Sequence, residues 1–80
     1  MTVPELKSRK EIATWITAEL QKVKTCEECT VNSVMPLRQP DRDGCNWSDS
    51  IVVRAGPEAD YEPHLRRIVQ EARRRFNVAQ

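Results

Sequence analysis

The stretch Asp41–Ser48, Asp-Arg-Asp-Gly-Cys-Asn-Trp-Ser, forms a polar centre midway along this 80-residue chain. Its Asp43-Gly44 pair supports the positive φ angle of a tight hairpin turn, and the side chain of Asn46 can bond to nearby backbone. On both sides apolar and polar residues alternate, from Cys29 to Leu37 and from Cys45 to Ala55. Because side chains alternate between the two faces of a strand, this pattern predicts an antiparallel hairpin that bends at Asp41–Ser48.

An amphipathic helix is predicted outside each strand. Ser8 and Glu11 have the spacing of a capping box, so the first helix should begin there, and it should end near Thr25. The last helix should run from about Asp60 to Asn77. Each helix carries one apolar stripe: Ile12, Trp15, Ile16, Leu20 and Val23 in the first, and Tyr61, Leu65, Ile68, Val69, Ala72 and Phe76 in the last.

These elements predict a single small α+β domain over residues 1–80, with residues 1–7 as a loose lead-in. The expected fold is a two-layer helix–strand–strand–helix (αββα) arrangement, in which both helices cover one face of the antiparallel hairpin. A lone hairpin is marginally stable in water, and its outer edges stay open to pairing. Two copies that joined their hairpins into a four-stranded sheet would remove both defects, so we expect a homodimer.

The composition favours a folded domain and indicates no particular partner class. Hydrophobic residues make up 39% of the chain and charged residues 31%, and the net charge is +1. No apolar run approaches the roughly 20 residues of a membrane span, and the amino terminus lacks the pattern of a signal peptide. Three cysteines, an odd number, fit a reducing compartment. We therefore expect a cytoplasmic protein that does not act at a membrane.

The cysteines allow two interpretations. Cys26 and Cys29 form a C-x-x-C pair, and together with Cys45 and His64 they would supply the ligands of a Cys₃His zinc site. A confident zinc signature needs a second close-set pair, which this chain lacks. The default interpretation is that Cys29 and Cys45 are small core residues and that Cys26 lies at a helix end, so we expect no metal and no cofactor.

Arg42, Asn46 and Trp47 are the candidate partner-binding residues at the bend. Trp47 begins the second predicted strand, where a large aromatic either closes the core or stands exposed as an anchor for a partner. Burial is the commoner position for such a side chain, and the pattern leaves both positions open.

The last helix carries the densest positive charge of the chain. Arg66, Arg67, Arg73 and Arg74 are the candidate contacts to nucleic-acid phosphates. Glu71 interrupts this patch, and a solvated helical face with local ion pairs is the simpler interpretation. A nucleic-acid-associated, regulatory protein is therefore the alternative and not the first hypothesis.

The segment Asp43–Ser48, taken with Glu71-Ala72-Arg73 and Phe76-Asn77 of the last helix, resembles a group of short uncharacterised bacterial proteins. The resemblance implies no activity, cofactor or site residue. The chain has one histidine, no nucleophile motif and no phosphate-binding glycine loop. We therefore predict a small non-enzymatic protein-interaction module whose partner is a second copy or another protein.

Overall fold

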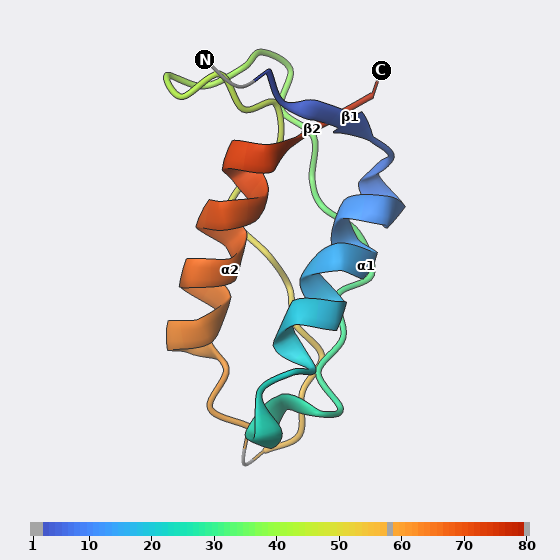
Figure 1. The fold of residues 1–80 in the computed structure, drawn as a ribbon, viewed down its shortest axis with the longest axis vertical. Coiled ribbons are helices and arrows are strands. Elements are labelled where there is room, and N and C mark those ends of the chain that lie inside the picture. The colour runs from blue at the N-terminus through green and yellow to red at the C-terminus, as the bar shows by residue number, and fades with distance from the viewer. Residues whose placement is uncertain (1–2, 58, 80) are drawn as a thin grey trace.

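Two helices and one two-stranded parallel sheet form the regular structure of this α+β chain (Figure 1). The computed structural model describes residues 3–57 and 59–79. Strand β1 (Glu5–Lys7) leads into helix α1 (Arg9–Leu20), which is followed by a 3₁₀ turn, η1 (Lys24–Cys26). Helix α2 (Glu62–Arg75) leads directly into strand β2 (Phe76–Val78). The two strands pair in parallel, with Leu6 beside Asn77, so the two ends of the chain meet in one sheet.

Helix α1 begins with the predicted capping box. The Ser8 hydroxyl accepts a hydrogen bond from the Glu11 N–H at 3.0 Å, and the Glu11 carboxylate accepts from the Ser8 N–H at 3.1 Å. Ile12, Ile16 and Leu20 of its apolar stripe are buried. The helix ends at Leu20, earlier than predicted, and η1 follows after a short turn.

Helix α2 begins at Glu62, with a proline in its first turn, where the missing N–H has no helical partner. Three arginines occupy its last turn, where cations oppose the negative end of the helix dipole. The predicted helix was too long at this end, because Phe76 has extended angles (φ −130°, ψ 142°) and starts β2.

The predicted antiparallel hairpin, and with it the αββα fold class, is wrong. The sheet is parallel and joins the chain ends, and the described residues between η1 and α2 form no strand. We call residues 29–37 the first arm and residues 45–55 the second arm. The arms run antiparallel but meet at only two isolated bridges, Thr30 with Arg54 and Pro36 with Trp47. A dimer made by joining two hairpins therefore has no hairpin to build on.

The arms fail to form a ladder because other groups take their backbone hydrogen bonds. The Thr17 hydroxyl of α1 accepts from the Val31 N–H at 2.9 Å and donates to the Val31 C=O at 3.3 Å. The Gln21 amide donates to the Cys29 C=O at 3.1 Å. Pro36 has no N–H to donate. Between the two bridges the second arm is also one residue longer than the first, so the arms fall out of register.

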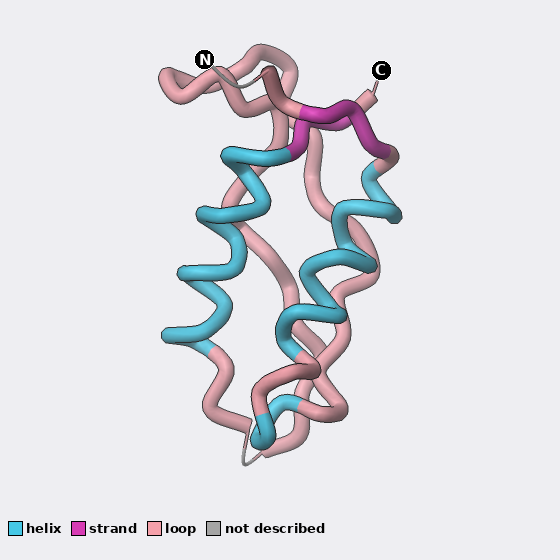
Figure 2. Tube along the Cα trace, viewed as in Figure 1, coloured by secondary structure: helices cyan, strands magenta, loops and turns pink. Residues whose placement is uncertain are grey.

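The core lies between the paired helices and the arms. Figure 2 shows α1 and α2 side by side, with the sheet at one end of the pair and η1 at the other. The buried core residues are Ile12, Ala13, Ile16, Leu20, Cys26, Cys29, Val31, Val34, Cys45, Trp47, Ile68, Val69, Ala72, Phe76 and Val78.

No helix among residues 3–57 and 59–79 is long and apolar enough to cross a membrane.

Candidate functional site

Asp41 holds the central turn in shape. One of its carboxylate oxygens accepts hydrogen bonds from the Asp43 N–H at 2.9 Å and from the Cys45 N–H at 3.2 Å. The Gly44 N–H donates to the Asp41 C=O at 2.9 Å. Gly44 has a φ angle of +78°, which a residue with a side chain rarely adopts, so the turn requires glycine here. The predicted turn residues thus act as a turn, although no hairpin ladder follows it.

Asn46 closes the outer edge of β2. The Ala79 N–H donates to the Lys7 C=O, so in this parallel ladder the N–H and C=O of Val78 point away from β1. The Val78 N–H donates to the Asn46 side-chain oxygen at 2.7 Å, and the Asn46 side-chain nitrogen donates to the Val78 C=O at 2.9 Å. A single side-chain amide therefore takes the place of a third strand.

Trp47 and Arg73 add further contacts between the central turn and the segment where α2 leads into β2. Trp47 is fully buried, and its indole N–H donates to the Phe76 C=O at 3.0 Å. The Arg73 guanidinium lies 5.7 Å from the centre of the indole ring and donates to the Trp47 C=O and to the Asp41 carboxylate. We call the side chains of Asp41, Asn46, Trp47 and Arg73 the terminal lock, because together they fasten the central turn to the end of the chain.

The three residues that were predicted from the sequence to bind a partner have different surroundings. Trp47 lies in the core, and Asn46 is bonded to β2. Arg42 is the one of the three that is exposed. The predicted trio at the bend does not form a common surface.

The four arginines proposed as nucleic-acid contacts also have different surroundings. Arg66 and Arg67 are exposed on α2. The Arg73 side chain is only 14% exposed and belongs to the terminal lock. Arg74 and Arg75 both bind the Glu71 carboxylate. These contacts lower the pKa of Glu71, chiefly through the hydrogen bond from Arg75. Within residues 3–57 and 59–79, Arg66 and Arg67 are the two of the four whose guanidinium makes no ion pair.

The four residues of the zinc alternative are not brought together. Cys26 and Cys29 lie at η1, at one end of the helix pair, whereas Cys45 lies in the turn that packs on β2 at the other end. Within the described part of the chain, no group of three or more histidine, cysteine, aspartate or glutamate side chains is placed to hold a metal ion. His64 is half-buried in the first turn of α2.

All three thiols are buried and free. Burial raises the pKa of Cys29 to about 11, and hydrogen bonding to Cys26 adds to this effect. Burial likewise raises the pKa of Cys45, whose sulfur lies 3.6 Å from the Trp47 C=O. The thiolate is the nucleophilic form of cysteine, so these side chains have the character of core residues.

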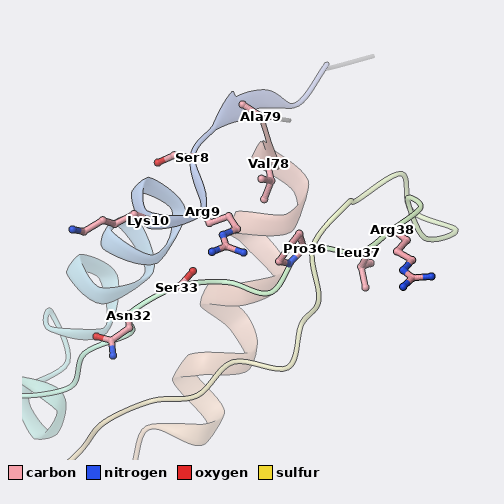
Figure 3. Close-up of a pocket in the computed structure, with 10 residues that line it drawn as sticks. All are labelled: Ser8, Arg9, Lys10, Asn32, Ser33, Pro36, Leu37, Arg38, Val78 and Ala79. Atoms are coloured by element: carbon pink, nitrogen blue, oxygen red, sulfur yellow. The ribbon is translucent and has the colours of Figure 1, made fainter.

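A groove beside the sheet is lined by three cationic residues together with apolar and small polar ones (Figure 3). Arg9 and Lys10 come from the first turn of α1 and Arg38 from just beyond the first arm, and Figure 3 shows Arg9 extending from α1 toward Pro36. In residues 3–57 and 59–79, no carboxylate pairs with any of these three cations. The remaining lining residues are Ser8, Asn32, Ser33, Pro36, Leu37, Val78 and Ala79. The groove can therefore accept an anionic group together with apolar side chains.

Sequence reasoning missed this groove because its lining comes from three distant parts of the chain. No motif links Arg9 to Arg38, which lie 29 positions apart in the sequence. A scan of protein-family models and searches of curated proteins and of solved structures found no match for this chain. The resemblance to short bacterial proteins therefore stays a prediction from the sequence.

Proposed function

We propose that this domain is a non-enzymatic interaction module that binds an acidic, extended segment of another protein. The observation that carries the proposal is the groove, whose described lining combines Arg9, Lys10 and Arg38 with apolar residues and contains no carboxylate. Complementary charge guides such a partner to its site, and the apolar lining residues contact its uncharged side chains. We call this surface the cationic groove.

The chemistry of the cationic groove favours a protein over a nucleic acid. Among the lining residues, Pro36, Leu37 and Ala79 present an aliphatic surface, which suits side chains such as leucine. Single-stranded nucleic acids are usually bound by aromatic side chains on which bases stack. Trp47 is buried in the core and no aromatic residue lines the groove. A net charge of +1 also gives little general attraction for a polyanion.

The test is a binding titration with a fluorescent probe peptide in which glutamates flank two leucines. Two double variants reverse the same number of charges: Arg9→Glu/Arg38→Glu in the cationic groove and Arg66→Glu/Arg67→Glu on α2. Each lost surface contact is worth about 0.2–1 kcal/mol, and reversal adds repulsion, so the groove variant should bind about tenfold more weakly. The α2 variant should bind as the wild type does.

Matched probes separate this proposal from its rivals. A peptide with lysine in place of glutamate should not bind, and added salt should weaken binding of the acidic peptide because the contacts are solvent-exposed. No binding of the acidic peptide, or equal loss in both double variants, would reject the groove. Binding of a single-stranded oligonucleotide of the same charge that is lost only in the α2 variant would instead support the nucleic-acid alternative.

A further inference from the structure

The two outer edges of the sheet are treated differently by the rest of the chain. Asn46 and Trp47 occupy the hydrogen-bonding groups on the outer edge of β2. In β1, the backbone N–H and C=O groups of Glu5 and Lys7 point toward β2. Those of Leu6 therefore point to the other side, away from β2. Neither group of Leu6 has a hydrogen-bond partner among residues 3–57 and 59–79. Strand β1 also lies at an end of the molecule, beyond both helices (Figure 1).

We propose that this open edge pairs with the same edge of a second copy, antiparallel, about a two-fold axis at Leu6. The N–H of each Leu6 then donates to the C=O of the other Leu6, which is the hydrogen-bonded pair of an antiparallel ladder. The result is a four-stranded sheet in the order β2-β1-β1-β2. The Leu6 side chain is 66% exposed in the single chain and gains an apolar neighbour.

The charges of β1 specify this register. Residue 5 of one copy stands opposite residue 7 of the other and on the same face, so two Glu5–Lys7 pairs form across the axis. A shift of the axis to Glu5 would place two glutamates face to face, and a shift to Lys7 would place two lysines face to face. Within one chain Lys7 already lies 3.3 Å from Glu5, so both side chains are held on this face. The segment Glu5–Lys7 is therefore complementary to itself.

The contact is short, so the dimer is weak. Pro4 has no N–H with which to extend the ladder, and the Ser8 N–H already donates to Glu11. Because β1 is short and is flanked by charged residues, few other strands can pair with its edge. Such an interface forms a transient dimer whose population depends on protein concentration.

Charge reversal tests the register directly. Glu5→Lys and Lys7→Glu each place like charges opposite one another in a homodimer, so each should raise the dissociation constant about tenfold or more. The double variant Glu5→Lys/Lys7→Glu should dimerise like the wild type. An equimolar mixture of the two single variants should form heterodimers, because every cross-axis pair is then of opposite charge. Sedimentation velocity measures the affinities, and native mass spectrometry separates the heterodimer by mass.

Folding of each variant is checked by circular dichroism and urea unfolding. Glu5 is exposed, but Lys7 lies 5.5 Å from the centre of the Phe76 ring, so its reversal can also disturb the core. If Lys7→Glu does not fold, Leu6→Lys takes its place, since it sets two ammonium groups face to face at an exposed position. A wild type that stays monomeric at high concentration overturns the proposal. So does a dimer whose affinity is unchanged by the single reversals, because its interface lies elsewhere.

Discussion

Replacement of Asn46 by alanine tests whether a side chain substitutes for a strand. The variant loses two hydrogen bonds, of 2.7 and 2.9 Å, to the backbone of Val78. Val78 is only 5% exposed, so its N–H and C=O are left without partners near the core. Each lost bond is worth about 1 kcal/mol net, and an unsatisfied buried group costs about 1–3 kcal/mol. Because Asn46 itself is half-exposed and water can reach part of the gap, we expect a loss of about 2–3 kcal/mol.

That loss is a large part of the stability of so small a domain, which is about 4–12 kcal/mol for 80 residues. Urea unfolding followed by tryptophan fluorescence measures it, and hydrogen exchange of the Val78 amide reports the local opening. The matched control is Asn32→Ala, because Asn32 is exposed and its side chain makes no hydrogen bond in the described part of the chain. A surface change of this kind should shift stability by less than about 0.5 kcal/mol.

A second variant, Asn46→Asp, keeps the size of the side chain and an acceptor for the Val78 N–H. When ionised it has no donor for the Val78 C=O and instead places negative charge beside that oxygen. It should therefore be at least as unstable as Asn46→Ala at neutral pH. If Asn46→Ala and Asn32→Ala unfold at the same urea concentration, the amide does not hold β2 and our account of the terminal lock is incorrect.

Two further predictions concern ionisable groups. Hydrogen bonds from the Ser8 backbone and hydroxyl lower the pKa of Glu11 below 4.5, so its charge stabilises the fold above that pH and the effect is lost as pH falls through the lowered value. The wild type should thus have a higher melting temperature than Glu11→Gln at pH 7, and the difference should vanish in acid; a constant difference contradicts the assignment. Because the pKa of Cys29 is about 11, only about one thiol in a thousand is ionised at pH 8, and all three cysteines are buried. Iodoacetamide should therefore alkylate the cysteines at that pH no faster than the protein unfolds. Rapid labelling of the folded protein would contradict this prediction.

The helices were predictable because their signals are local. The Ser8–Glu11 capping box and the repeating apolar residues of α1 and α2 each lie within a few turns of one another. The sheet was not predictable in the same way. Strands β1 and β2 have three residues each, too few for a periodic pattern, and they come from opposite ends of the chain. Their pairing depends on the whole fold that lies between them.

The arms failed as strands for a reason that the alternating pattern does not contain. Alternation predicts which side chains are buried, and Cys29, Val31, Cys45 and Trp47 are buried. It fails further along the first arm, where Met35 is 66% exposed and Val34, which the pattern places on the other side, is buried. It does not report where the backbone N–H and C=O groups find partners. The cationic groove was hidden for a related reason, because Arg9 and Arg38 come to line one groove only through the tertiary fold.

Buried backbone groups must be hydrogen-bonded, but the partner need not be a strand. A side-chain amide carries one carbonyl oxygen and an NH₂ group, so Asn46 offers Val78 the same donor and acceptor as a peptide unit. Thr17 does the same for Val31 with one hydroxyl. A sheet ladder spreads its stability over many equivalent bonds, whereas here it is concentrated in a few polar side chains. Loss of one such side chain should therefore loosen a whole arm, which makes polar residues that look like solvated surface in the sequence as important as those of the core.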